Sequence, residues 1–239
     1  MKAAGRCLGL IGGLGVGAAV HYYVNLAKAH HAQDRVMDLV MAHAEPPLLM
    51  EFIRAGDREG MARHLNGFVT RMKAAGAELA VIPAVTPHYC VHELIAISPL
   101  PLVNIFDPLN RELASRSLKR AAVFGTRFVI ESDLYGEVTG VELVRPQADE
   151  TELIHNIYTK LALSGEASPE QHRELTELAH KLIERERLDA IILAGTDLSL
   201  LFNESNIDFP CIDCAELHIA AIAREMLGSE SVASGQWLV

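Results

Sequence analysis

Ionisable and hydroxyl side chains follow three short apolar runs of this sequence, where they could move protons. They are Thr86 and His88 after the run at 79–82, Thr196 and Asp197 after the run at 190–193, and His43 and Glu45 after the run at 37–42. A histidine is the commonest general acid or base near pH 7, and burial raises the pKa of a carboxyl group toward that range. We therefore predict that His88 and Asp197 transfer protons, with Thr86 and Thr196 beside them. The competing interpretation is that His88 and Asp197 cap the helices that follow them.

A glycine-rich segment, Gly12 to Gly17, follows the first apolar run and precedes a helical stretch. Glycines in such a position let backbone amides approach and bind an anion. The spacing does not match the dinucleotide-binding fingerprint, because the third glycine is missing from the required place. We predict that Gly12, Gly13 and Leu14 bind a substrate carboxylate; a tight turn without a ligand is the alternative.

Short apolar runs alternate with longer amphipathic segments, and this alternation is typical of strands and helices in a parallel sheet. The runs are continuously apolar, as expected for strands that are buried on both faces. Ser168 and Pro169 are suited to the N-cap and the first position of a helix. Strands are predicted at 7–11, 37–42, 79–82, 121–124, 141–144, 190–193 and 210–212, and helices at 57–75, 150–163 and 169–186. The fold class is therefore α/β.

Two segments of the chain resemble each other, since a strand, a loop with a threonine and a helix occur at 81–93 and again at 191–202. This repetition predicts two pseudo-symmetric lobes of flavodoxin-like or doubly wound type, with a parallel sheet in each. Residues 1–101 would form the first lobe, together with a strand and helix at 210–239, and residues 102–209 would form the second. Because open α/β sheets bind ligands at the carboxyl ends of their strands, we expect the site in a cleft between the lobes.

Composition and charge narrow the classes of protein. Half of the 239 residues are hydrophobic, which is enough for a buried core. A formal net charge of −10, without a long basic block, argues against a nucleic-acid partner. No apolar stretch approaches the ~18 residues of a membrane-spanning helix, and the apolar N-terminus is too rich in glycine for a signal peptide. We therefore expect no membrane partner and a cytoplasmic protein whose four cysteines stay reduced.

Two pairs of potential metal ligands have a suitable spacing but lack companions. Cys211 and Cys214 form a Cys-x-x-Cys motif, and His88 and His92 are four residues apart on an expected helix. Protein zinc sites use at least three side-chain ligands, and no third ligand is identifiable for either pair. We therefore predict that the protein has no metal site.

Several strings together are similar to the Asp/Glu/hydantoin racemase superfamily. Leu10 to Gly15, followed by His21-Tyr22-Tyr23, resembles the glycine-rich turn and helix that open those proteins. Pro83 to His88 (PAVTPH) resembles the family's Pro-Cys-Asn-Thr-Ala-His, and Ala194 to Leu198 (AGTDL) resembles its Gly-Cys-Thr-Glu-Ile. Further matches lie at 124–128, 133–135 and 212–218, so the resemblance extends from about Leu8 to His218.

The resemblance implies a small carboxylate substrate, no cofactor, a homodimer, and two cysteines that transfer protons on opposite faces of the substrate. Ala84 and Gly195 stand at the positions of those cysteines, so the two-thiol mechanism is not available to this chain. No arginine or lysine matches the family's carboxylate-binding residues, and Phe106, Phe128 and Leu163 could line a pocket for a bulkier or less charged substrate. The residues expected to bind substrate are Gly12, Gly13, Leu14, His43, Glu45, Ala84, Val85, Thr126, Gly195 and His218.

Three functions remain open at this point. The leading hypothesis is a cofactor-independent isomerase, a racemase or epimerase, that acts on a small chiral carboxylate through non-cysteine acids and titrates with a histidine-like pKa. The second is a hydrolase or lyase in the same cleft, with Thr86, His88 and Asp197 orienting water or polarising a carbonyl. The third is a catalytically inactive protein that binds a small ligand.

Overall fold

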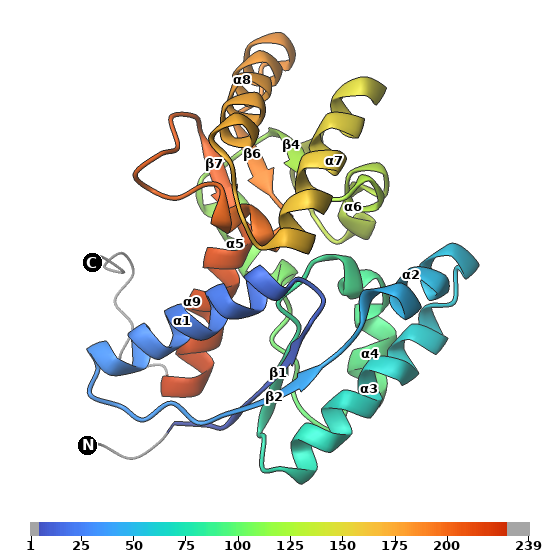
Figure 1. The fold of residues 1–239 in the computed structure, drawn as a ribbon, viewed down its shortest axis with the longest axis vertical. Helices are drawn as coiled ribbons and strands as arrows, with labels where there is room; N and C mark the ends of the chain where they lie inside the picture. The colour runs from blue at the N-terminus through green and yellow to red at the C-terminus, as the bar shows by residue number, and fades with distance from the viewer. Residues whose placement is uncertain (1–4, 229–239) are drawn as a thin grey trace.

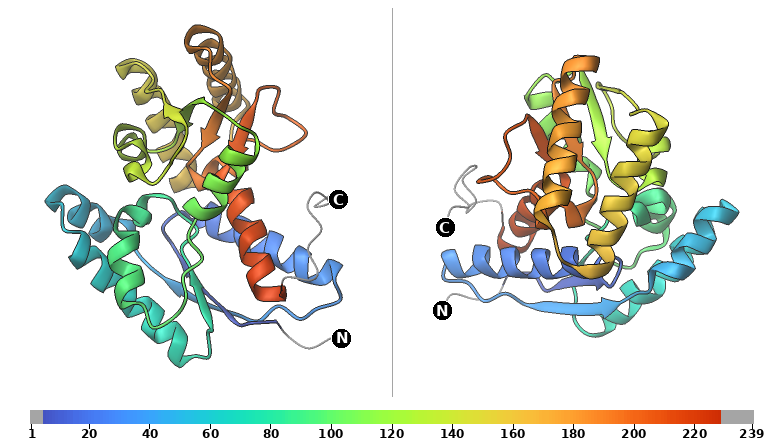
Figure 2. Two further views of the ribbon diagram at one scale, coloured as in Figure 1. Left: turned by 180° about the vertical axis from the view of Figure 1, so that it is seen from behind. Right: turned by 45° about the horizontal axis from the view of Figure 1, so that its top comes forward.

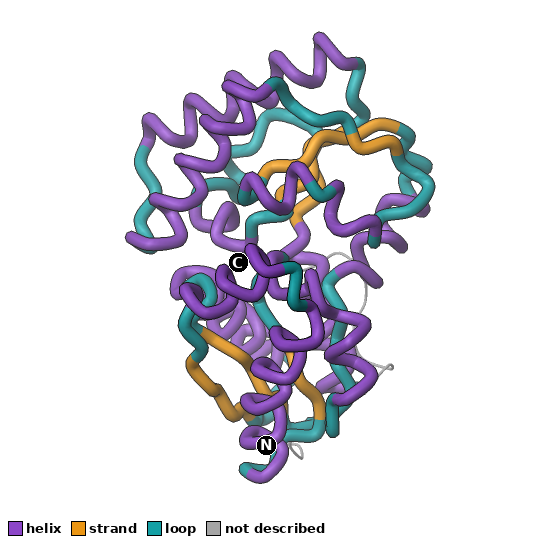
Figure 3. Tube along the Cα trace, turned by 90° about the vertical axis from the view of Figure 1, so that its right-hand side faces the viewer, coloured by secondary structure: helices purple, strands orange, loops and turns teal. Residues whose placement is uncertain are grey.

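The computed structural model describes residues 5–228, which form two α/β lobes stacked against each other (Figure 1). Each lobe has its own parallel sheet with helices around it, as Figure 3 shows. The predicted α/β class with two parallel sheets is therefore confirmed. Residues 1–4 and 229–239, which the sequence assigned to the first lobe, lie outside the described residues. No helix within residues 5–228 is long and apolar enough to cross a membrane.

The first lobe is built on a three-stranded sheet in the order β2-β1-β3. A parallel bridge between Ala80 and Leu102 adds a fourth position beside β3. The strands are β1 (Leu8–Gly12), β2 (Leu39–His43) and β3 (Leu79–Val81), and the helices are α1 (Val16–Ala32), α2 (Pro46–Ala55), α3 (Arg58–Ala74), the 3-10 helix η1 (Thr86–Cys90) and α4 (Val91–Ile97).

The second lobe repeats this plan with the strand order β5-β4-β6-β7. The strands are β4 (Arg120–Phe124), β5 (Glu142–Leu143), β6 (Ala190–Leu193) and β7 (Cys211–Asp213), and the helices are α5 (Phe106–Ser115), α6 (Arg127–Glu131), the 3-10 helix η2 (Asp133–Gly136), α7 (Ala148–Ser164), α8 (Pro169–Glu186) and the 3-10 helix η3 (Thr196–Leu200). Within residues 5–228, the structure has a strand at each of the seven predicted places. The suggested duplication is visible as corresponding strand orders, with β3-η1 in one lobe matched by β6-η3 in the other.

The lobes exchange the helices that follow their last strand positions. Helix α5 comes after Leu102 of the first sheet but packs into the core of the second lobe, through Phe106, Leu109 and Leu113. Helix α9 (Cys214–Leu227) comes after β7 but returns to pack beside α1 and β1, as Figures 1 and 2 show. The strand predicted at 210–212 therefore stays in the second sheet, paired with β6, and only the helix returns to the first lobe. The expected division was wrong for this strand.

Local sequence explains the helix that was predicted most sharply. Helix α8 starts at Pro169, and the Ser168 hydroxyl accepts a hydrogen bond from the Gln171 amide. The Gln171 side chain in turn accepts one from the Ser168 amide, completing a capping box. The helix ends at Glu186, as predicted.

Candidate functional site

The carboxyl ends of β3 and β6 meet where the two lobes touch. The Thr196 hydroxyl donates a hydrogen bond of 3.0 Å to the carbonyl oxygen of Pro83, the residue before Ala84. Ala84, Thr196 and Asp197 are all buried, with exposed fractions of 5, 1 and 0%. The sequence-predicted threonine and aspartate are therefore brought against the end of the other lobe's strand, and in this structure the lobes are in direct contact there.

Asp197 holds the two lobes together through the N-terminus of α1. Its Oδ1 atom accepts a hydrogen bond of 2.9 Å from the amide of Ala18, in the first turn of that helix. A side chain on Gly15 would collide with the carboxylate, because its Cβ would lie 3.0 Å from Asp197 Cγ and closer to Oδ2. The carboxylate that lies beside the glycine-rich segment in this structure belongs to the protein, and the binding of a substrate carboxylate by Gly12, Gly13 and Leu14 stays a prediction. Asp197 caps a helix, but that helix is α1 of the opposite lobe and not the helix that follows Asp197 in the chain.

Two opposing effects act on the Asp197 carboxyl group. Burial raises its pKa above the usual range, because the ionised form loses its hydration. The bonds donated by the Ala18 amide and the Tyr158 hydroxyl stabilise the ionised form and lower the pKa in turn. Burial is the larger effect, so the pKa of the Asp197 carboxyl group lies above its usual range.

Tyr158, on α7, fills the space beside Gly195. A Cβ atom on Gly195 would lie 2.6 Å from Cδ2 of the tyrosine ring, which is closer than real Cβ atoms come. The Tyr158 hydroxyl donates a hydrogen bond of 3.2 Å to Asp197 Oδ2. Burial and the neighbouring carboxylate raise the pKa of the Tyr158 phenol well above its ordinary value. The second lobe's strand end is therefore a phenol and a carboxyl group in contact.

His88 is buried at the other strand end, and both of its ring nitrogens contact backbone groups. Nδ1 lies 2.8 Å from the Ala84 carbonyl oxygen, to which it donates, and Nε2 accepts a weaker bond of 3.4 Å from the Ile105 amide. Burial lowers the pKa of His88 to about 4. The ring is therefore neutral near pH 7 and has no free nitrogen, so a histidine-like titration of activity is not expected from it. The His88 ring accepts its hydrogen bond from Ile105, the N-cap residue of α5, and does not cap the helix that follows His88 in the chain.

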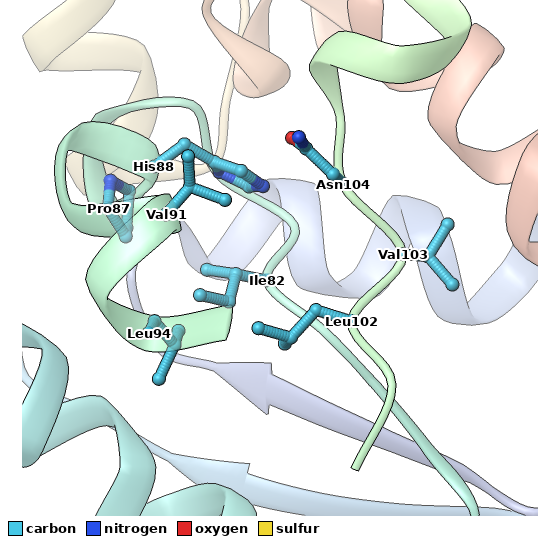
Figure 4. A pocket seen from close by; sticks show the side chains of 8 residues that line it. All are labelled: Ile82, Pro87, His88, Val91, Leu94, Leu102, Val103 and Asn104. Atoms are coloured by element: carbon cyan, nitrogen blue, oxygen red, sulfur yellow. The ribbon is translucent and has the colours of Figure 1, made fainter. Parts of the chain in front are cut away.

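His218, on α9, is placed in the same way beside His88. Its Nε2 atom donates to the Val103 carbonyl oxygen at 2.8 Å, and Nδ1 accepts from the Tyr22 hydroxyl at 3.1 Å. Burial, together with His88, lowers the pKa of His218 to about 3. The two histidines hold the segment at 103–105 that crosses between the lobes. Figure 4 shows the His88 ring pointing from η1 toward that segment, over a small cavity lined by Ile82, Pro87, His88, Val91, Leu94, Leu102, Val103 and Asn104.

The other predicted binding residues are placed less centrally. His43 and Glu45 are exposed and pair with each other, Nε2 to Oε1, at 3.2 Å. Thr126 is the N-cap of α6, where its hydroxyl accepts a bond from the Val129 amide. Gly13 has φ +90°, and a Cβ there would collide with the backbone after β2, so it serves a tight turn.

Aromatic side chains from both lobes pack together next to this contact. The Tyr89 ring of the first lobe lies 5.2 Å from that of Phe128 and 5.7 Å from that of Tyr135, both in the second lobe. The Arg58 guanidinium lies 4.2 Å above the Tyr89 ring centre. Phe128 thus lies near the lobe contact, and its place in a substrate pocket stays a prediction. Leu163 is 82% exposed, so the prediction that it lines a pocket was wrong.

None of the four cysteine thiols has the lowered pKa that a reactive thiol needs. Cys7, Cys90, Cys211 and Cys214 are all free, and burial raises the pKa of every one of them. Within residues 5–228, no group of three or more His, Cys, Asp or Glu side chains is arranged to hold a metal ion.

No feature of the sequence pointed to Tyr158 as part of the site. It stands next to Ile157 on a helix whose buried positions include Ile154 and Leu161, and such a tyrosine is ordinarily part of a core. Its relation to Gly195 depends on how α7 packs across the end of β6. The only available hint was the glycine itself, because a position without a side chain leaves space that some other group must fill.

Comparison with known proteins relates these features to a family. The family model described as Asp/Glu/hydantoin racemase matches residues 11–222. An aspartate racemase homologue from Pyrococcus horikoshii OT3 has a TM-score of 0.72 and 21% identity, over 93% of this chain and 100% of that one. Aspartate racemase from Picrophilus torridus has a TM-score of 0.73 and 19% identity, over 93% and 94%. Glutamate racemase from Francisella tularensis, in complex with D-glutamate, has a TM-score of 0.67 and 12% identity, over 97% and 85%.

Proposed function

Because this chain belongs to the Asp/Glu/hydantoin racemase family, we propose that it is a cofactor-independent isomerase that moves a proton on a small carboxylate. The site proposed is the contact between the ends of β3 and β6. The observation that carries the proposal is the buried Asp197 carboxyl group, which lies at that contact with a pKa raised by burial. Such a group can take a proton from carbon and return it near neutral pH.

The side chains favour chemistry on one face of the substrate. Neither Ala84 nor Gly195 can transfer a proton, which leaves the two-thiol mechanism without its groups at these positions. On the β3 side the nearest titratable group is His88, and its ring nitrogens contact the backbone of Ala84 and Ile105. On the β6 side Asp197 accepts hydrogen bonds and can accept a proton. We therefore assign the base to Asp197 and not to His88.

A carboxylate suits this site because the N-terminus of α1 already binds one. The Ala18 amide donates to Asp197, and the partial positive charge of a helix N-terminus favours any anion there. A substrate carboxylate bound near this helix N-terminus, beside Asp197, would have to displace the contact between Thr196 and Pro83. The related glutamate racemase is seen with D-glutamate, which supports a small amino or hydroxy acid as the first substrate class to try.

The test is proton exchange in deuterated water with both enantiomers of aspartate, glutamate, malate and phenylalanine. Deuterium entering at the carbon next to a carboxylate, or conversion to an isomer of unchanged mass, is expected for the wild-type protein. Asp197→Asn should reduce the exchange rate by about 10²- to 10⁴-fold, the range that a general base contributes. Fragments whose masses sum to that of the substrate would indicate a lyase, and fragments that sum to the substrate plus one water would indicate hydrolysis; either result would contradict the isomerase.

A second candidate is a protein that binds a carboxylate without converting it. The direct contact of Thr196 with Pro83, and of Asp197 with Ala18, favours it because the site is filled by the protein's own groups. Calorimetric titration with the same acids, showing saturable binding in the absence of exchange, would support this candidate over the isomerase.

The homodimer implied by the resemblance stays a prediction. Light scattering coupled to size-exclusion chromatography measures it directly, since a monomer has a mass of 26.1 kDa and a dimer twice that.

A further inference from the structure

We propose that Tyr158 is the catalytic residue that exchanges the proton with substrate carbon on the β6 side, with Asp197 as its partner. Its phenol would take the place of the thiol that position 195 lacks. This inference rests on the proposed function and names the atom through which that function operates.

The first support is the position of the ring. A side chain on Gly195 would start within 2.6 Å of Tyr158 Cδ2 and 3.1 Å of Cζ, the carbon that bears the hydroxyl. The edge of the Tyr158 ring therefore lies where a side chain of residue 195 would begin, and the ring carbon that bears the hydroxyl is next to it. An oxygen acid delivered from α7 can reach the space that a sulfur acid at 195 would reach from β6.

The second support is the contact between the phenol and the carboxyl group. The Tyr158 hydroxyl donates to Asp197 Oδ2 at 3.2 Å, while Oδ1 is held by the Ala18 amide at 2.9 Å. Asp197 is thus fixed in orientation, with one oxygen committed to α1 and the other to the phenol. A carboxylate in this position can receive the phenol proton when the phenol oxygen takes another.

The step balances without a cofactor. The substrate C–H bond breaks, its electron pair stays on the substrate and spreads into the adjacent carbonyl or carboxyl group, and its proton goes to the phenol oxygen. The original phenol proton moves at the same time to Asp197 Oδ2. The tyrosine is therefore neutral before and after, the aspartate becomes a carboxylic acid, and the negative charge passes to the substrate as an enolate. The reverse step returns a proton to the same carbon or to another atom of the enolate.

The end of β3 has no side chain free to transfer a proton, so proton transfer takes place on one face of the substrate only. Ala84 has only a methyl group, and the nitrogens of His88 contact Ala84 and Ile105 backbone atoms. A proton returned from Tyr158 arrives on the face from which it left, so configuration is retained. The substrate class is an acid with a C–H bond next to a carbonyl or carboxyl group. Isomerisation then consists of returning the proton to another atom of the enolate on the same face, and the signature at the original carbon is deuterium exchange without racemisation.

The chain offers a matched control for the key substitution. Tyr135 is also a half-buried tyrosine at the lobe contact, but its hydroxyl donates to the Thr86 carbonyl oxygen at 3.4 Å and not to a carboxylate. Removing the Tyr135 hydroxyl tests the effect of a missing phenol oxygen near the site without touching Asp197.

The experiment measures deuterium incorporation and enantiomeric composition for wild type, Tyr158→Phe, Tyr135→Phe and Asp197→Asn with the panel of acids named above. We expect exchange with retention in wild type and Tyr135→Phe, and a loss of about 10²-fold or more in the other two. Exchange in Tyr158→Phe within threefold of wild type, or racemisation by wild type, would overturn the role of Tyr158 but leave the isomerase standing. A wild-type protein that exchanges no acid of the panel would overturn both.

A second variant covers the case in which Tyr158→Phe does not fold. Replacing Tyr158 alone with 3-fluorotyrosine keeps the ring and hydroxyl but makes the phenol more acidic. Because the step needs the neutral phenol, the alkaline limb of the pH profile of exchange should then move to lower pH, and the same replacement at Tyr135 should leave that limb in place. An unmoved profile for the labelled Tyr158 would contradict the proposal, because a merely structural phenol would not set the pH dependence.

Discussion

The ends of β3 and β6 are two versions of one arrangement. Each is a buried parallel strand that runs into a 3-10 helix whose first residue is a threonine, Thr86 in one lobe and Thr196 in the other. At the end of β3 the titratable group is His88, neutral and bonded to the backbone. At the end of β6 it is Asp197, which faces the opposite lobe and contacts the hydroxyl of Tyr158.

A repeated backbone therefore does not determine the chemistry of its repeats. A small residue at each strand end leaves space, and the two lobes fill it differently. Beside Gly195 the space is taken by a polar ring from another helix, whereas at Ala84 the carbonyl group is bound by a histidine from its own loop. The end of β6 therefore has a carboxyl group, Asp197, that is hydrogen-bonded to a phenol. The end of β3 has a neutral histidine that is hydrogen-bonded to the backbone.

The largest effect expected from this contrast is the pH dependence of stability contributed by His88. The unfolded chain binds a proton at His88 below about pH 6.5, whereas in the folded protein burial lowers the pKa to about 4. Between these values the unfolded state carries more protons, so folding stability falls as the pH falls, by about 3 kcal/mol from pH 7 to pH 4 for this residue. Urea unfolding of wild type and His88→Gln across that range would measure it, with the variant losing less stability.

The comparison between variants removes contributions of the opposite sign. Burial raises the pKa of Asp213 to about 6, so that group stabilises the folded protein as the pH falls, but it is present in both proteins. His31→Gln serves as the control because His31 is exposed at the end of α1. Equal pH slopes for wild type and His88→Gln would mean that His88 takes up a proton as readily in the folded protein as in the unfolded chain, and the two strand ends would no longer differ in this respect.

The second largest effect expected is on the stability of the protein when Gly195 is replaced. Its φ of −99° and ψ of 110° suit any residue, so Gly195→Ala would be opposed only by contact with Tyr158. We expect a loss of about 1–3 kcal/mol in the free energy of unfolding, typical of overpacking. The same substitution in a Tyr158→Ala background should cost little, giving a coupling energy of similar size.

The neighbouring Gly125 provides the control for that cycle. A Cβ there would lie 3.5 Å from its nearest neighbours, which is ordinary contact, so Gly125→Ala should stay within about 0.5 kcal/mol of wild type. An equal cost of Gly195→Ala with and without the Tyr158 ring would show that the ring does not fill the space beside residue 195.

The sequence was sufficient for features set by near neighbours in the chain. The apolar run at 190–193 and the cap formed by Ser168 and Pro169 appear in the structure at the predicted residues. These features depend on hydrogen bonds and burial within a few positions, so their pattern is visible in the string of residues. The fold class followed from the same local patterns and from the family resemblance.

The candidate site depended on contacts that no local pattern contains. Asp197 bonds to Ala18, 179 residues away, and Tyr158 reaches Gly195 from a helix in the same lobe. His88 was predicted to transfer protons because histidines do so, yet the Ile105 amide and the Ala84 carbonyl leave its ring no free nitrogen. Such partners are fixed by how helices and crossovers pack, which a single sequence does not show.

Replacing the cysteines is expected to have the smallest effect on the rate of deuterium exchange. Cys90 belongs to the β3 end and Cys214 begins α9 after β7; burial raises the pKa of Cys90 to about 12 and that of Cys214 still further. Thiols that stay protonated at neutral pH are poor bases and nucleophiles, so replacing Cys7, Cys90, Cys211 and Cys214 together with alanine should leave the exchange rate unchanged.

Deuterium exchange at matched folded concentrations measures this, with Cys90→Ala and Cys214→Ala made singly as controls. A large loss in either single variant would return sulfur to the mechanism at that strand end, and the assignment of the chemistry to Asp197 would have to be abandoned.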